Sequence, residues 1–176
     1  MKPGSSRRYE IRSATEADLP GVLRCLRLAF EPYRDQYTPE AFLDTVLTTK
    51  TARDRLVSMR VLVAEERSGE AIGTLAWRPE SEGTGHLRGM AVVPDHQGTG
   101  AAQALLDIAL REMTDRGISR VTLDTTPPLH RAIRFYERNG FRPSGRVSDF
   151  FGMPLTEWVR DLRAERSRNA RTGGTD

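Results

Sequence analysis

The chain changes from an extended to a helical pattern within Val92-Val93-Pro94-Asp95-His96-Gln97-Gly98-Thr99-Gly100-Ala101-Ala102-Gln103-Ala104-Leu105-Leu106. A β-branched, apolar run ends at Pro94, and a short polar loop with two glycines leads into an amphipathic pattern. Gly98 and Gly100 carry no Cβ, so the backbone can turn sharply there and approach a ligand closely. The first N–H groups of a helix lack partners inside it, and the helix dipole adds partial positive charge. The loop is therefore a candidate binding site for an anion, above all for phosphate.

Three interpretations of this loop are open. A glycine-rich turn without a ligand is the simplest, because short motifs discriminate loosely. A dinucleotide-binding loop requires G-x-G-x-x-G/A directly after the strand, and here position 103 is Gln; Asp124 would then be the acid that binds the ribose. The third interpretation is the pyrophosphate loop of the GCN5-related N-acetyltransferase (GNAT) family. Gln97, Gly100 and Ala102 resemble its pattern Q/R-x-x-G-x-G/A, which follows a V-x-P strand end.

The composition suits one soluble globular domain, because 38% of the 176 residues are hydrophobic and 29% are charged. No apolar run is long enough to span a bilayer, and the N-terminus lacks the apolar stretch of a signal peptide, so we expect no membrane partner and a cytoplasmic location. The net charge of +3 is modest and basic residues alternate with acids, which argues against a nucleic-acid partner. Cys25 is the single cysteine and the histidines are scattered, so we expect no disulfide and no metal site.

The pattern of apolar residues predicts one ordered domain over residues 9–162, between a flexible leader (1–8) and a disordered, Arg-rich tail (163–176). Apolar periodicity, caps and turn residues predict the elements in between. The predicted strands cover 9–12, 60–65, 71–77, 86–93, 120–125, 141–151 and 155–162, and residues 80–85 are a predicted loop. The predicted helices cover 15–31, 38–47, 49–59, 101–116 and 129–139.

A second motif lies in Ala132-Ile133-Arg134-Phe135-Tyr136-Glu137-Arg138-Asn139-Gly140-Phe141, which resembles A-x-x-F/L-Y-x-x-x-G-F of the GNAT family. Together with the loop and the order of elements, it makes residues 9–162 resemble a complete GNAT domain. The resemblance implies an α/β GNAT fold, with a mixed, mostly antiparallel sheet of six to seven strands and about four helices. It also implies an N-acetyltransferase that moves the acetyl group of acetyl-CoA directly to an amine of a small molecule or peptide.

Two other functions remain as alternatives at this point. One is a CoA-binding module without turnover. The other is a nicotinamide-dinucleotide oxidoreductase, which the predicted hairpins before the loop disfavour because a dinucleotide fold needs βαβ units on both sides. The resemblance leaves the oligomeric state open between a monomer and a homodimer formed through a sheet edge.

The resemblance also implies roles for individual residues. It places the hydroxyl of Tyr136 at the sulfur of acetyl-CoA, where it donates a proton to the departing thiolate. It assigns cofactor binding to the backbone of Met90, Ala91, Val92, Gln97, Gly98, Thr99, Gly100, Ala101 and Ala102. Gln97 replaces the commoner Arg, which leaves more of the binding to amides. Leu129 stands where the family often has an Asn that binds the pantetheine arm, and Leu cannot make that bond. A backbone group or His130 replaces it, or the affinity for the cofactor is lower.

The general base is open between two residues. His86 is the first candidate, because an imidazole titrates near neutrality and period-2 alternation places it on the same side as Arg88, Met90 and Val92. Glu82, in the predicted loop, is the second. A polar strand residue without a catalytic role explains His86 equally well. His96 is expected to flank the phosphate.

The acceptor pocket is expected between the first two helices and the late strands. Aromatic side chains with a carboxylate among them suit an amine with an apolar body, although the same residues would also complete a core and its rim. The candidates are Tyr33, Arg34, Asp35, Gln36, Tyr37, Trp77, Asp149, Phe150 and Phe151.

Overall fold

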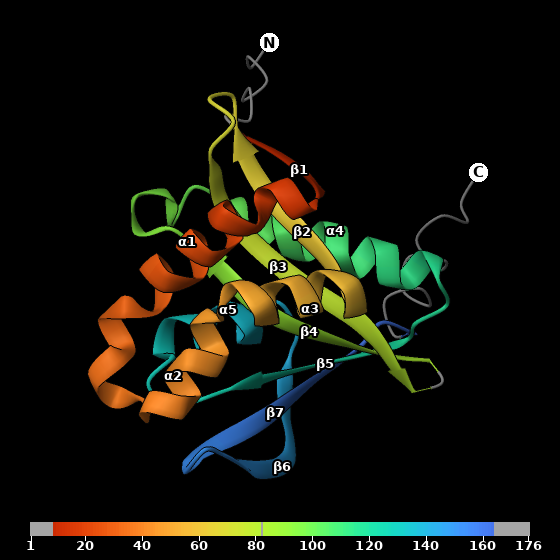
Figure 1. The fold of residues 1–176 in the computed structure, drawn as a ribbon. Coiled ribbons are helices and arrows are strands. Elements are labelled where there is room, and N and C mark those ends of the chain that lie inside the picture. The colour runs from red at the N-terminus through yellow and green to blue at the C-terminus, as the bar shows by residue number, and fades with distance from the viewer. Residues whose placement is uncertain (1–8, 82, 164–176) are drawn as a thin grey trace, which may run out of the picture.

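The computed structural model describes residues 9–81 and 83–163 (Figure 1). The predicted leader (1–8), nearly all of the predicted tail and Glu82 lie outside the described residues. The elements are β1 (Tyr9–Ser13), α1 (Leu19–Phe30), α2 (Pro39–Val46), α3 (Thr49–Ser58), β2 (Arg60–Glu66), β3 (Ala71–Ser81), β4 (Thr84–Val92), α4 (Ala101–Asp115), β5 (Arg120–Thr125), α5 (His130–Arg138), β6 (Arg142–Phe150) and β7 (Met153–Asp161). Short 3-10 turns cover Glu16–Asp18, Glu31–Gln36 and Pro94–His96.

The seven strands form one sheet in the order β1-β2-β3-β4-β5-β7-β6. Only the neighbours β4 and β5 run parallel, and every other pair is antiparallel. The mixed, mostly antiparallel sheet is thus confirmed, with five α-helices in the described part of the chain rather than about four. The antiparallel ladder from β1 to β4 excludes the doubly wound parallel sheet that a dinucleotide fold requires.

Helices cover both faces of the sheet. On one face, α4 packs through residues such as Leu105 and Leu106 against Leu75 and Trp77 of β3. On the other face, α1 and α3 pack against a second core; its strand residues are Val61, Val63, Ala76 and Ala91. Figure 1 shows α1 and α3 in front of the strands and α4 behind them. Because both faces are covered, a ligand has to enter between strands or at the edge of a layer.

Local sequence signals explain most element boundaries. Helix α2 begins after Thr38, whose hydroxyl accepts the N–H of Ala41, with Pro39 in the first turn. The charged segment 49–59 is helical as predicted, and a capping box between Thr48 and Thr51 begins it. No helix in the described ranges is long and apolar enough to cross a membrane.

The predicted loop over 80–85 is wrong in extent. β3 continues to Ser81 and β4 begins at Thr84, so the hairpin turn is much shorter. The carbonyl of Gly83 in this turn accepts N–H groups from Ser119 and Arg120. These contacts tie the turn to the segment before β5, far along the chain. The polar, glycine-containing sequence shows no apolar alternation, so tertiary contacts rather than local pattern extend the strands.

Candidate active site

The sheet opens between β4 and β5. The two strands pair from Thr84 with Arg120 to Leu87 with Leu123, and the pairing ends there. One residue beyond, β4 contains a bulge. On β3, Leu75 alone separates the partners of Arg88 and Ala91, so two residues of β4 oppose a single residue. The second half of β4 therefore turns away from β5 and leaves an opening in the middle of the sheet.

The bulge reverses which side chains of β4 face each layer. Gly89 adopts φ of 66°, which glycine tolerates without strain. Beyond it, Ala91 packs in the core under α1 and α3, while Met90 and Val92 pack with the α4 core. The prediction that His86, Met90 and Val92 share one face is therefore wrong, because period-2 alternation holds only as far as the bulge. Gly89, a glycine inside the predicted strand 86–93, is the sequence signal that could have indicated the bulge.

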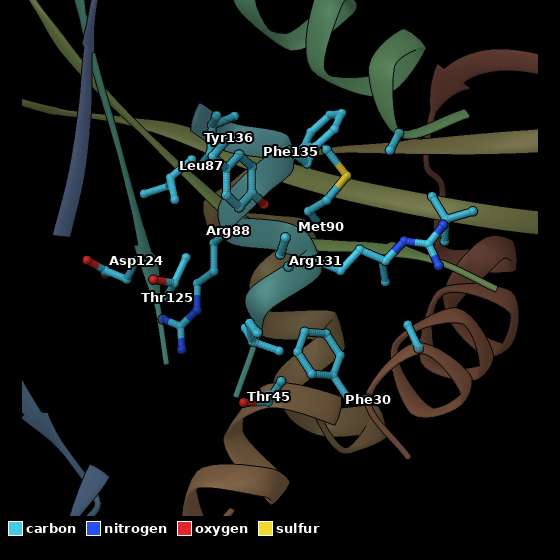
Figure 2. A pocket seen from close by; sticks show the side chains of 18 of the residues that line it. Phe30, Thr45, Leu87, Arg88, Met90, Asp124, Thr125, Arg131, Phe135 and Tyr136 are labelled. Atoms are coloured by element: carbon cyan, nitrogen blue, oxygen red, sulfur yellow. The ribbon is translucent and has the colours of Figure 1, made fainter. Parts of the chain in front are cut away.

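A cavity of about 560 Å³ fills this opening and is lined from both layers (Figure 2). Seven of the nine predicted cofactor-binding residues line it, and so do Tyr136 and His86; the seven are Met90, Ala91, Val92, Gln97, Gly98, Gly100 and Ala102. Thr99 and Ala101 do not line it. Thr99 is exposed and its hydroxyl donates to the carbonyl of His96, whereas Ala101 is buried in the α4 core. The structure thus brings the loop, the end of β4 and the second motif to one cavity.

The start of α4 presents unsatisfied amides to this cavity. Gly98 and Gly100 adopt φ of 80° and 90°, and Gly100 is the N-cap of the helix. The first bond of the helix runs from the N–H of Ala104 to the carbonyl of Gly100. The N–H groups of residues 101–103 accordingly have no partner one turn earlier in the helix, which is the general condition for anion binding.

Gln97 holds the loop against its neighbours. Its side-chain amide donates to the carbonyl of Val92 at 3.0 Å, and its side-chain oxygen accepts from Nη1 of Arg131 at 2.7 Å. Arg131 lies on α5 and also lines the cavity. The positive charge that Gln97 does not supply is therefore brought to the loop from another element. His96, expected to flank the phosphate, does line the cavity, and its Nε2 lies 2.8 Å from a carboxylate oxygen of Glu66.

Tyr136 is buried on α5, with 7% of its surface exposed. Its ring makes edge contacts with Phe135 and Phe141 at centroid distances of 5.5 and 5.8 Å. Figure 2 shows the ring on the cavity wall, with Leu87 and Met90 on either side of it in this view. Burial raises the pKa of the Tyr136 phenol well above its ordinary value of 10. The hydroxyl consequently stays protonated at pH 7, as a proton donor must.

His86 contacts β5 where β4 and β5 still pair, next to the opening. Its Nδ1 lies 2.9 Å from Oγ1 of Thr122, and its Nε2 lies 3.6 Å from Oδ2 of Asp124. Burial lowers the pKa of His86 and raises the pKa of Asp124. Sequence reasoning gave Asp124 a role only in a dinucleotide site; the register that pairs His86 with Thr122 places it beside the imidazole instead. Glu82, the other candidate base, lies outside the residues that the structure describes.

The structure around Leu129 distinguishes between a backbone group and His130 as the replacement for the family's Asn. Leu129 is the N-cap residue of α5 and lines the cavity. His130 is exposed and does not line it, so this placement gives His130 no contact with a ligand there. A backbone group remains the replacement that is compatible with the described geometry.

The acceptor side differs from the prediction. Among the predicted residues, Tyr33, Tyr37 and Phe150 line the cavity. Trp77 does not: it is fully buried in the α4 core, where its Nε1 donates to Glu112. The remaining five candidates also lie off the cavity wall: Arg34, Asp35, Gln36, Asp149 and Phe151.

Charged residues to which the sequence analysis gave no role also line this wall, among them Arg55 on α3, Asp44 on α2 and Arg88 on β4. Asp44 and Arg88 form an ion pair. In sequence, Arg55 lies in a segment so charged that nothing distinguished it from surface arginines, and only the position of α3 brings it to the cavity.

Known proteins resemble this chain in sequence and in fold. The sequence model of the Acetyltransferase (GNAT) family matches residues 22–141. A mycothiol acetyltransferase of Propionibacterium freudenreichii is 30% identical over 104 residues, which are 54% of this chain and 33% of that protein. The chain thus spans about a third of the length of that relative. An uncharacterised N-acetyltransferase of Mycobacterium bovis is 28% identical over 106 residues, 60% of this chain and 68% of that protein.

Solved structures share the fold at low sequence identity. The PaiA N-acetyltransferase of Thermoplasma acidophilum, solved in complex with coenzyme A, superposes with a TM-score of 0.72 at 18% identity, covering 87% of this chain and 98% of the other. A GNAT-family acetyltransferase of Staphylococcus aureus gives a TM-score of 0.72 at 17% identity over 88% and 99% of the two chains. The fold expectation is confirmed. The chain belongs to the GNAT family of acetyltransferases.

Proposed function

We propose that this chain transfers the acetyl group of acetyl-CoA directly to a primary amine of a small molecule or peptide. The observation that carries the proposal is one continuous cavity that joins the free amides of α4 to the bulge in β4 and to Tyr136. In that order, these three sites suit the diphosphate, the extended arm and the reacting thioester of acetyl-CoA.

The residues present fit coenzyme A. The amides of Gly98, Gly100 and Ala102, which line the cavity, would hold the pyrophosphate, with Arg131 supplying positive charge beside them. The N–H of Thr99 already donates to the carbonyl of His96, at 3.4 Å, so its share is smaller. Beyond Leu87, β4 has no partner on the β5 side, which leaves the backbone at Met90, Ala91 and Val92 open to an extended arm.

Tyr136 acts as the general acid in this proposal. When bound, acetyl-CoA supplies the acetyl group as a thioester, whose departing sulfur has to gain a proton. Tyr136 lines the cavity, and burial keeps the proton of its hydroxyl in place at working pH. A buried phenol therefore acts here as a proton donor and not as a base.

The pair of His86 and Asp124 acts as the general base. Burial favours the neutral imidazole of His86, and Asp124 beside it stabilises the imidazolium that forms when the pair takes up a proton. Both residues line the cavity. A proton from the acceptor amine can reach the pair directly or through one water molecule.

The test measures release of coenzyme A thiol from acetyl-CoA with a panel of primary amines, together with protection from heat unfolding. A ligand at a hundredfold excess over its dissociation constant stabilises a protein by about 2.7 kcal/mol. We expect such protection by coenzyme A and none by NAD, with thiol release that depends on the amine. Protection without thiol release for any amine would instead indicate a CoA-binding module without turnover.

A further inference from the structure

A buried guanidinium lies in the cavity wall next to the bulge. Arg55 on α3 is only 9% exposed, and a Cβ built on Gly89 would lie 2.5 Å from its Nη1. The same Cβ would lie 3.9 Å from the side chain of Leu26 on α1. Gly89 thus allows the positive φ of the bulge, and its missing Cβ leaves the space that this guanidinium occupies. Arg55 is thereby fixed where β4 turns away from β5.

No carboxylate among the described residues forms an ion pair with Arg55. Within the described ranges it forms no hydrogen bond and no ion pair, although a guanidinium carries five N–H donors. The nearby carboxylate of Asp44 is engaged by Arg88. Burial, with the positive charge of Arg88 nearby, lowers the pKa of Arg55 to about 10, which still leaves it charged at pH 7. Burying an unpaired charge is costly, so its persistence at a cavity wall points to a ligand.

Apolar and aromatic side chains adjoin this charge. Phe30 lies four residues after Leu26 on α1 and therefore on the same helix face. Phe30 also makes ring contacts with Tyr33 and Tyr37, at centroid distances of 6.5 and 6.4 Å. All three rings line the cavity, on the side where the acceptor is expected. This part of the wall thus combines the buried guanidinium of Arg55 with an apolar, aromatic surface.

We propose that the acceptor is an amine that carries a carboxylate, which Arg55 binds, and an apolar body that packs against Phe30, Tyr33 and Tyr37. Amino acids with apolar side chains and short peptides are the simplest compounds of this class. A carboxylate suits the site because the planar guanidinium matches it with two parallel hydrogen bonds. It also suits the local charge, because the nearby carboxylate of Asp44 pairs with Arg88 and a monoanion would neutralise Arg55.

The inference rests on the proposed function and narrows its substrate class. Matched acceptor pairs test it: phenylalanine against phenylalaninamide, and leucine against leucinamide. Each amide keeps the amine and the side chain but lacks the carboxylate. We expect kcat/KM of the wild type to be at least about tenfold higher for the acids, because a site built for a polar group rejects analogues without it. Arg55→Gln is expected to raise KM for the acids by about tenfold or more, with a smaller change in kcat, and to remove the preference.

Arg53→Gln is the matched control, since Arg53 lies on the same helix but is exposed and pairs with Glu16. It is expected to leave the preference intact. Arg55→Lys is expected to retain part of the preference, because it keeps the charge and loses the fork. The melting temperature of Arg55→Gln is expected to equal or exceed that of the wild type, since the guanidinium forms no hydrogen bond or ion pair with the described residues.

Three results would overturn the inference: amides that are used as well as acids by the wild type, an equal loss for both in Arg55→Gln, or the same loss in Arg53→Gln. An equal loss would assign Arg55 to the reaction itself. If coenzyme A protects the protein but thiol is released with none of the amines, the proposed function fails. Binding of 3-phenylpropionate then tests whether Arg55 forms a carboxylate site. That acid lacks an amine, so its affinity for the CoA-bound protein reports on the carboxylate site alone. Weaker binding to Arg55→Gln supports the site, and equal binding overturns it.

Discussion

Arg131 of α5 donates a hydrogen bond from Nη1 to the side-chain oxygen of Gln97 at 2.7 Å. An arginine from outside the glycine loop thus contacts the first residue of that loop. The loop itself carries no basic residue at the position where the family commonly has one. Because Arg131 also lines the cavity, we propose that its charge compensates for that replacement.

Arg131→Gln is expected to weaken CoA binding by about three- to tenfold, because a solvent-accessible phosphate contact contributes on the order of 1 kcal/mol. The loss should shrink as ionic strength rises, since salt screens exposed charges. Arg134→Gln, on the same helix but exposed and away from the cavity, is the control and should bind normally. Titration calorimetry at two salt concentrations measures both. A loss of equal size in the two variants would point to general surface charge rather than to the contact with Gln97.

Tyr136→Phe is expected to lower kcat by about 10²-fold while CoA affinity changes little, because general acid catalysis contributes factors of that order. Phenylalanine keeps the ring contacts with Phe135 and Phe141, and no described residue bonds the hydroxyl. The melting temperature should therefore stay the same, which separates a catalytic effect from a folding effect. Steady-state kinetics with saturating acceptor gives the result, and an unchanged kcat would remove Tyr136 from the mechanism.

Signals that are local in sequence predicted much of the fold. The strand 120–125 has the predicted boundaries, and Thr38 with Pro39 begins α2 as a cap and first-turn proline. Each of these signals acts within one turn or one strand, so a single sequence contains all the information that it needs. The loop glycines are similar: their positive φ angles follow from the strand-to-helix transition at Gly98 and Gly100.

The parts of the site that sequence reasoning missed depend on register and on packing between distant elements. The face of Met90 follows from the bulge at Gly89, which shifts β4 against β3. The contact between His86 and Asp124 follows from the parallel pairing of β4 with β5. The place of Arg55 follows from how α3 lies on the sheet, and its own segment carries no apolar face strong enough to indicate burial.

Gly100→Val is expected to abolish CoA binding, because φ of 90° at the N-cap is unfavourable for a β-branched residue and the side chain would stand at the phosphate site. Backbone strain alone costs about 1–3 kcal/mol, which could lower affinity indirectly. Gly117→Val controls for this: it follows the other end of α4, has φ of 79°, and a Cβ there meets nothing within 4 Å. Both variants should lose stability, and only Gly100→Val should lose the thermal protection by coenzyme A. Protection of Gly100→Val would move the phosphate site elsewhere.

His86→Ala is expected to flatten the acidic limb of the pH dependence of kcat/KM. Burial lowers the pKa of His86 below the ordinary histidine value of about 6.5. In the wild type, kcat/KM is therefore expected to fall only at pH values below that, because the pair becomes protonated there and can no longer accept a proton. In Asp124→Asn the limb should move to lower pH, since the Asp124 carboxylate raises the pKa of His86. His130→Ala, at an exposed site off the cavity wall, should leave the profile unchanged. If His86→Ala keeps the limb and Asp124→Asn removes it, Asp124 alone is the base, because the proton then binds to its carboxylate.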